Sequence, residues 1–127
     1  MGFREMLPTG CPPPNARDGA FEVAFRLVST VNPDVSAFES HAAKQEPLPP
    51  GVTPCRWASC SLFVDLETVA KKRNAFKKLL KYPFAAELKI PVGSGLLVED
   101  SKHIDFWMYD TFDPLAAIVV IRDLDNA

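Results

Sequence analysis

Cysteine and histidine are scarce in this sequence. The 127 residues include three cysteines, Cys11, Cys55 and Cys60, and two histidines. An odd number of widely spaced cysteines does not indicate a disulfide framework, so we expect reduced thiols. Cys55 and Cys60 lack the two-residue gap of zinc knuckles and the chain has no second cysteine pair, so we expect no metal site. A nucleophilic pair formed by Cys55 and His103 stays open as an alternative.

Long apolar runs and an excess of one charge are also missing. No stretch approaches the roughly 18 uninterrupted apolar residues of a membrane span, and the start, "MGFREMLPTG", lacks the features of a secretory signal. Fourteen basic and sixteen acidic side chains give a formal net charge of −2, which provides no overall attraction to nucleic acid or anionic lipid. We therefore expect a soluble cytoplasmic protein that does not associate with membranes.

Proline, in contrast, is abundant, with 12 residues. Residues 1–20 contain four of these prolines and follow neither a helical nor a strand period, which predicts an irregular arm. Residues 21–127 are predicted to form a single domain. Within it, the segment "EPLPPGVTP" at 46–54 predicts a long, stiff loop, a type of segment that often carries function.

The hydrophobic pattern of the domain predicts both strands and helices. Strict alternation of apolar and other residues predicts a strand at 21–28. Helices are predicted at 32–44, capped by Asn32, and at 66–80, capped by Asp65. Further strands are predicted at 60–64, 84–90, 96–99, 103–109 and 116–123. The predicted fold is α+β, a mixed, mainly antiparallel sheet of five or six strands with two helices in the first two thirds.

The predicted helix at 66–80 carries a cluster of basic side chains. The cluster is Lys71, Lys72, Arg73, Lys77, Lys78 and Lys81. Most of it forms the solvated face that an amphipathic helix needs, and no aromatic side chain on that face offers a base a stacking surface, so we do not expect nucleic-acid binding. Arg73 is the exception, because it projects within the apolar arc, where it should either extend to the edge or meet a carboxylate.

The stretch "HIDFWMY" at 103–109 is the richest in chemistry. Its alternation places His103, Asp105, Trp107 and Tyr109 on one face of a strand. A face that is both polar and aromatic suits a flat ligand whose orientation is fixed by hydrogen bonds. The alternative is that Trp107 packs under a loop or helix while His103 and Asp105 face water.

Two arginines are further candidates for a binding site. Arg26 lies in the middle of the first strand, where a charged side chain is costly unless it is paired. It should meet an acidic partner such as Glu22 or Asp105, or face a cleft that receives an anion. Arg56 precedes Trp57 just before the second strand.

The order of these segments resembles that of a known group of proteins. The segments are "FRLV", a proline-rich loop, "CRWASCSLFVDLETVA", "FAAELKIP" and "HIDFW". Over residues 21–122 this layout resembles a group of short uncharacterised bacterial proteins. More distantly, it is similar to the NAD-handling fold of ADP-ribosyltransferases, including RES-domain toxins and transfer-RNA 2′-phosphotransferases. The resemblance implies that Arg26 holds a dinucleotide, that Arg56 contacts phosphate and that Ser61 lines the nicotinamide side.

Two functional hypotheses follow. The first is a nucleotide-binding domain for NAD or ADP-ribose, with ADP-ribosyl-transfer or NAD-glycohydrolase chemistry. Arg26 and Arg56 would then neutralise phosphate, and Ser61 would bond a ribose. One of the tryptophans, Trp57 or Trp107, would stack on a ring, and His103 or Asp105 would assist proton transfer. The second is a non-catalytic protein-interaction or immunity-type module, in which the same aromatic residues form an interface.

Overall fold

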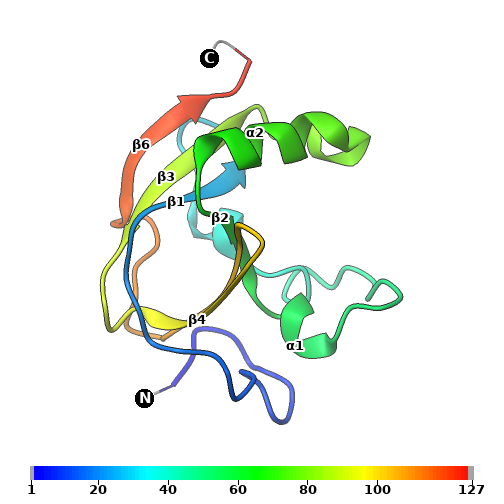
Figure 1. Ribbon diagram of the computed structural model, residues 1–127, viewed down its shortest axis with the longest axis vertical. Coiled ribbons are helices and arrows are strands. Elements are labelled where there is room, and N and C mark those ends of the chain that lie inside the picture. Colours follow the sequence, from blue (N-terminus) through cyan, green and yellow to red (C-terminus); the bar gives the residue numbers. More distant parts are fainter. Residues whose placement is uncertain (1, 126–127) are drawn as a thin grey trace.

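The fold is built on one six-stranded sheet. The computed structural model describes residues 2–125, so Met1 of the predicted arm and residues 126–127 of the predicted domain lie outside the described residues. The strand order is β4-β5-β2-β1-β3-β6, and neighbouring strands pair antiparallel (Figure 1). The strands are β1 (Phe21–Val28), β2 (Cys60–Phe63), β3 (Phe84–Ile90), β4 (Gly95–Asp100), β5 (His103–Met108) and β6 (Ile118–Asp123). The predicted α+β class is confirmed.

The helices are shorter than the sequence pattern suggested. They are η1 (Val35–Phe38), α1 (Pro54–Trp57), α2 (Leu66–Ala75) and η2 (Lys77–Leu79). The helix predicted at 32–44 is wrong apart from the single turn η1, because Asp34 rather than Asn32 accepts the first backbone N–H, from Ser36. Asp65 caps α2 as predicted, accepting from the Thr68 N–H. That helix ends at Ala75 because Phe76 takes an extended conformation.

Apolar side chains fill both faces of the sheet. On one face, α2 places Val69 against Phe25, Phe63 and Ala85, and Leu124 completes this cluster. The other face carries a larger cluster from β1 to β5, centred on Leu62, Leu88, Ile104 and Phe106, and Phe38 of η1 packs against it. Both clusters are formed by residues from 21 onward, so the domain has a core without the arm.

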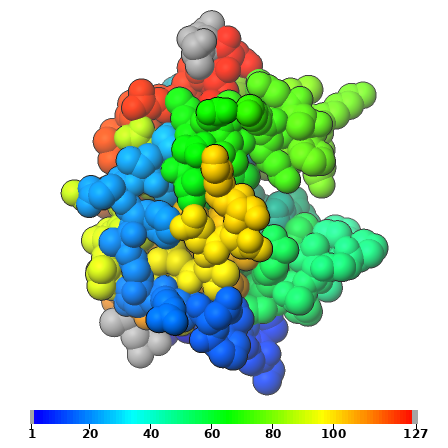
Figure 2. Space-filling view, in the orientation of Figure 1, coloured from blue at the N-terminus to red at the C-terminus, as the bar shows by residue number. Residues whose placement is uncertain are grey.

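The arm packs along the domain. Phe3 forms a bridge with Tyr109, and Arg17 forms one with Leu97 of β4. Figure 2 shows the blue N-terminal segment lying against the yellow strand β4. Among residues 2–125, no helix is long and apolar enough to cross a bilayer.

The expectation of three reduced cysteines is wrong. Cys11 of the arm and Cys55 of α1 form a disulfide, with a Cα–Cα distance of 5.4 Å. These residues are separated by 44 positions. Their proximity therefore follows from the path of the arm, which cysteine spacing along the chain does not reveal. Cys60 is a free thiol, and it is buried in the core.

Candidate functional site

A cavity of about 290 Å³ lies against β5, between the arm, α1 and the end of β4. We call it the β5 cavity. Its lining joins segments that are far apart in the sequence. The lining residues are Pro13, Asn15, Thr53, Cys55, Arg56, Val98, Asp100, His103, Asp105 and Trp107. It therefore brings together four of the predicted site residues, which are Arg56, His103, Asp105 and Trp107.

Strand alternation explains why the polar residues of β5 share one face. His103, Asp105 and Trp107 are two residues apart, so their side chains point to the same side. The antiparallel register with β4 sets Asp100 opposite His103 and Val98 opposite Asp105. Directly opposed residues in antiparallel strands also share a face, so β4 adds one wall of the cavity.

Asp105 is the centre of the site. It is only 7% exposed, and its Oδ2 lies 3.3 Å from Nε of Arg56. Its Oδ1 lies 3.5 Å from Nδ1 of His103 and 3.3 Å from the Ser59 hydroxyl, which donates more closely to the Arg56 carbonyl, at 2.7 Å. A buried carboxylate needs such partners, because an unpaired charge in a low dielectric is costly. Asp105 thus lies between a guanidinium and an imidazole, each within 3.5 Å of one of its carboxylate oxygens.

Arg56 reaches Asp105 from a short helix whose start is fixed locally. Thr53 caps α1, accepting a hydrogen bond of 3.2 Å from the Arg56 N–H, and Pro54 occupies the first turn. The Arg56 side chain is 57% exposed although it contacts the buried Asp105. Its guanidinium therefore contacts both the buried Asp105 in the β5 cavity and the solvent.

The environment of His103 favours the neutral imidazole. Burial lowers the pKa of His103 below its ordinary value, and the attraction of Asp105 opposes this effect. The positive charges of Arg56 and Lys72 lower the pKa further. Near pH 7 the ring therefore has one nitrogen able to accept a proton. The ring also packs edge-on against Phe63, with centroids 5.4 Å apart.

Trp107 forms part of the wall of the cavity rather than an exposed stacking surface. It is 2% exposed, and its indole N–H donates to the Cys55 carbonyl at 3.1 Å. The residue thus packs under α1, which is the alternative that the sequence left open for it. An interface centred on this ring, as the interaction hypothesis supposed, does not agree with its burial.

Trp57 and Ser61 lie outside the lining of the β5 cavity. The Trp57 ring stacks on His41, with centroids 4.1 Å apart, and its indole N–H donates to the Glu46 carbonyl. It therefore anchors the proline-rich loop. Ser61 lies opposite Asp105 in the register of β2 and β5, on the same face but deeper in the sheet.

Arg26 belongs to the opposite face. Phe25 is paired with Phe63, on the Asp105 face, so Arg26, the next residue, points the other way. Its Nε, Nη1 and Nη2 donate to the carbonyls of Ala37, Ser61 and Glu39, at 2.9, 3.0 and 3.1 Å. Both predicted outcomes, an acidic partner and an anion cleft, are wrong, because the turn around η1 and strand β2 supply backbone acceptors instead.

Several lining residues were missed from the sequence. Ser59 does not line the cavity, but it lies in the bend just before β2, where its hydroxyl reaches Oδ1 of Asp105, a contact that the sequence pattern did not indicate. Asp100 meets His103 because residues 101 and 102 form a tight turn with φ values of 53° and 68°. Pro13 and Asn15 of the arm left no such signal, since only the tertiary path brings them to the cavity.

Comparison with protein-family models, curated proteins and solved structures finds no match for this chain. Within residues 2–125, no group of three or more histidine, cysteine, aspartate or glutamate side chains is placed to hold a metal ion. The contacts within the β5 cavity are therefore the features that bear on function.

Proposed function

We propose that the β5 cavity binds a nucleotide-type ligand, NAD or ADP-ribose, and that His103 and Asp105 serve its chemistry. The observation that carries the proposal is the buried Asp105 carboxylate, which holds both Arg56 and His103 at the wall of a cavity. Titratable groups in a cavity, one with a shifted pKa and each with a defined partner, are typical of binding and catalytic sites.

Arg56 is the residue that we assign to phosphate. A guanidinium presents several donors in one plane and matches the oxygens of a phosphate group. The contact with Asp105 fixes one edge of Arg56, while its exposure leaves part of the group facing solvent. Lys72 adds positive potential near His103. A cavity of about 290 Å³ suits one ribose and its phosphate, so the remainder of a dinucleotide would lie along the surface.

His103 is the residue that we assign to proton transfer. Its Nδ1 faces Asp105, which leaves Nε2 to meet the ligand. In glycohydrolase chemistry, a water oxygen bonds to the ribose C1′ while the bond from C1′ to the nicotinamide nitrogen breaks. Nε2 accepts the proton of that water, and Asp105 stabilises the imidazolium that forms. In ADP-ribosyl transfer, an acceptor hydroxyl takes the place of water.

A thermal-shift comparison tests this function. ADP-ribose, NAD and inorganic phosphate are added to the wild-type protein, to Arg56→Ala and to Arg122→Ala. Arg122 is a matched control, because it is 48% exposed and pairs with Glu87 at 2.8 Å on the far half of the sheet. Ligand at about 100 times its Kd adds about 2.7 kcal/mol, a rise in Tm of several degrees.

We expect ADP-ribose to raise the Tm of the wild-type protein and of Arg122→Ala, but not that of Arg56→Ala. An equal rise in Tm in all three proteins would show that Arg56 does not contribute to ligand binding. No rise with any nucleotide, under oxidising or reducing conditions, would contradict the proposed function. Phosphate alone should give a smaller rise.

Binding of a protein partner is a second candidate function, favoured by β6. This strand lies at the end of the sheet order, with Val119 60% exposed. A larger cavity, of about 540 Å³, lies beside it and is lined by residues of the 89–94 and 111–119 segments. An edge strand with exposed valines suits pairing with an extended strand of another protein. Light scattering measures the mass of the particles in solution. A comparison of the wild-type protein with Val119→Lys would show whether the β6 edge pairs with another strand.

A further inference from the structure

The end of α2 and the residues after it concentrate positive charge. Residues 71–81 contain six of the 14 basic side chains of the chain and no acidic one. Arg73 turns inward to the Asp125 carboxylate and the Tyr82 carbonyl. The other five basic side chains are exposed and form what we call the lysine surface: Lys71, Lys72, Lys77, Lys78 and Lys81. A net charge of −2 for the whole chain therefore includes one strongly positive region.

The protein itself neutralises little of this charge. Within residues 2–125, the one ion pair of the lysine surface joins Nζ of Lys71 to Oε1 of Glu67 at 3.0 Å. Both side chains are more than three quarters exposed, at 78% and 77%. An exposed pair of this kind contributes little free energy and is easily exchanged for another partner. The lysine surface is thus available to an anionic partner.

Two large apolar side chains are exposed among these lysines. Phe76 is 44% exposed and Leu80 is 50% exposed. A longer helix would place Phe76, two turns after the buried Val69, on the face that packs against the sheet. Instead α2 ends at Ala75, and Phe76 takes an extended conformation with φ −122° and ψ 117°. Exposed apolar side chains gathered in one short segment, rather than scattered singly, are typical of an interaction site.

The lysines stay close to the aromatic rings of this segment. Nζ of Lys72 lies 4.7 Å from the centroid of the Phe76 ring, and Nζ of Lys81 lies 5.3 Å from that of Tyr82. Such cation–π contacts keep the ammonium groups beside the aromatic side chains. Positive charge and apolar surface are therefore presented together.

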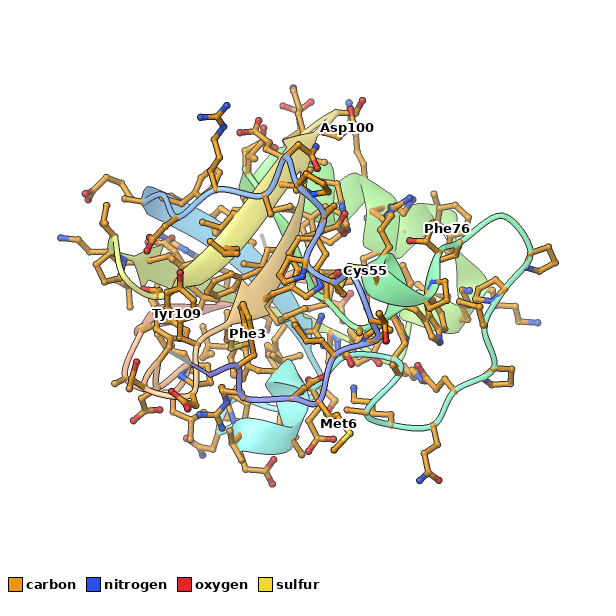
Figure 3. All side chains as sticks on the ribbon, turned by 90° about the horizontal axis from the view of Figure 1, so that it is seen from below. Phe3, Met6, Cys55, Phe76, Asp100 and Tyr109 are labelled. Atoms are coloured by element: carbon orange, nitrogen blue, oxygen red, sulfur yellow. A yellow bond between two sulfur atoms is a disulfide. The ribbon has the colours of Figure 1, made fainter. Side chains whose placement is uncertain are left out.

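This part of the molecule projects outward. Figure 2 shows the end of α2 and η2, in light green, projecting at the upper right. Figure 3 places Phe76 on the opposite side of the molecule from Phe3 and Tyr109, where the arm begins. Neither the β5 cavity nor the cavity beside β6 is lined by residues 71–81. A projecting surface suits a flat partner better than a bound helix, which needs a groove.

We propose that the lysine surface docks the protein on an anionic lipid bilayer. The lysines meet the charged headgroups, and Phe76 and Leu80 enter the boundary between the headgroups and the acyl chains. Lysines around exposed phenylalanine and leucine are characteristic of segments that lie on a membrane surface. The attachment is to the surface alone, since no helix within residues 2–125 could span a bilayer.

The inference rests on one local surface. The expectation that the protein does not associate with membranes was based on the net charge and on the lack of long apolar runs, and neither describes residues 71–81. The inference is also independent of the proposed function, because the lysine surface lies outside the lining of the β5 cavity.

Lipid fits this surface better than RNA does. Single-stranded RNA is held largely by aromatic rings and arginines that stack on its bases. The one arginine of the segment, Arg73, is buried against Asp125. Leu80 cannot stack on a base, but its aliphatic side chain gains free energy on leaving water for hydrocarbon. The combination of lysine with exposed leucine therefore favours a lipid surface.

Co-sedimentation with vesicles tests the inference. The wild-type protein is mixed with vesicles of phosphatidylcholine alone or of equal parts phosphatidylcholine and phosphatidylserine. We expect binding to be at least about tenfold tighter with phosphatidylserine, since each lysine near an anionic surface adds about fivefold. Raising the salt from about 0.1 M to about 1 M shortens the Debye length from about 10 Å to about 3 Å and should release the protein. Equal binding to both kinds of vesicle, or to neither, would overturn the inference.

A pair of lysine substitutions tests the charge. Lys77→Gln combined with Lys78→Gln should weaken binding to the phosphatidylserine vesicles by about 25-fold, or about fivefold for each lysine. Lys89→Gln is the matched control, because Lys89 of β3 is 61% exposed and lies outside the lysine surface. Wild-type affinity in the double variant, or an equal loss in the control, would contradict the assignment.

Substitution of the two apolar side chains tests the insertion. Phe76→Ser combined with Leu80→Ser should weaken binding to the same vesicles by at least about tenfold and leave its salt dependence in place. Val119→Ser is the control, because Val119 of β6 is 60% exposed. Unchanged affinity in the double variant would overturn the part assigned to Phe76 and Leu80. Circular dichroism checks that each variant is folded.

Phe76→Trp reports insertion directly, without relying on a loss of binding. Its fluorescence emission should move to shorter wavelength when phosphatidylserine vesicles are added, because the indole leaves water for the headgroup boundary. Val119→Trp provides the comparison and should not shift. A shift in both variants, or in neither, would contradict docking through the lysine surface.

Poly(U) distinguishes a lipid partner from a nucleic acid. We expect weak binding of poly(U) that Phe76→Ser with Leu80→Ser leaves unchanged, because the lysines alone attract its phosphates. Tighter binding to poly(U) than to the phosphatidylserine vesicles would assign the surface to nucleic acid and overturn the inference.

Discussion

One face of the sheet is covered in two different ways. Over β1 and β3, helix α2 lays Val69 on Phe25 and Ala85, and the contact is apolar. Over β5, the cover is the short helix α1 and the arm, and the residues beneath are His103 and Asp105. A regular helix hides an apolar surface well, whereas a polar cluster needs partners from irregular segments. The comparison indicates that the β5 region is built for polar contacts and the α2 region for stability.

The largest expected effect is a loss of stability caused by steric overlap in the β5 region. In Gly95→Ala, the new Cβ would collide with the Trp107 carbonyl and lie 2.7 Å from Cε1 of Phe106 and 2.9 Å from Cα of Met108. Because this backbone has no room to yield, we expect a loss of about 3 kcal/mol in the free energy of unfolding, measured in urea. Gly19→Ala is the control, since its nearest neighbour, a Leu97 methyl group, is 4.0 Å away. Equal stabilities of the two variants would contradict the tight pairing of β4 and β5.

The next largest effect is a loss of stability in the α2 region. It is tested by comparing two arginines that each pair with a carboxylate. Arg73 is buried and bonds Asp125 at 2.7 Å and the Tyr82 carbonyl at 3.1 Å, whereas Arg122 is half-exposed. Arg73→Met should lower the free energy of unfolding by about 2 kcal/mol, because it leaves the Tyr82 carbonyl without that donor. Arg122→Met should stay within about 0.5 kcal/mol of the wild type. Urea titrations of the two variants measure the difference, and similar losses would show that burial does not separate them.

The smallest effect is a change in how stability depends on pH. Because burial lowers the pKa of folded His103, the unfolded chain binds that proton more readily. The wild type should therefore lose stability as the pH falls below about 6.5 and through the lowered value. His103→Asn lacks this component, so its free energy of unfolding should fall less steeply between pH 7 and pH 5, a window set by the usual histidine pKa of about 6.5. If the free energies of unfolding of the two proteins fell in parallel with pH, burial would not lower the pKa of His103.

Much of the fold was predictable because it depends on local patterns. The strand at 21–28 and the cap at Asp65 lie within single segments, and both match the structure. The single buried face predicted for that strand is wrong, because Ala24 and Val28 are buried on the other face and Val23 is exposed. The shared face of His103, Asp105 and Trp107 also follows from the strand period alone. The turn at Phe76 escaped prediction, because the helical pattern continues through it.

The rest depended on contacts between distant segments. Arg26 finds its acceptors in the turn at residues 37–39 and in β2, which no spacing rule anticipates. The Cys11–Cys55 bond required the arm to fold back across 44 positions. Arg73 was the favourable case, since its place in the apolar arc predicted that it would either extend to the edge or meet a carboxylate, and Asp125 supplies the carboxylate. Local chemistry thus told us that a partner was needed, but tertiary structure determined which one.

The most direct test of the β5 cavity as the ligand site is an NMR titration of the disulfide-bonded protein with ADP-ribose, following the His103 ring, the Arg56 guanidinium and the Trp107 indole N–H. We expect these three signals to move together and to saturate at one ligand per chain, while β6 signals such as Val119 stay in place. Signals that do not move, or that move only at β6, would contradict the β5 cavity as the ligand site.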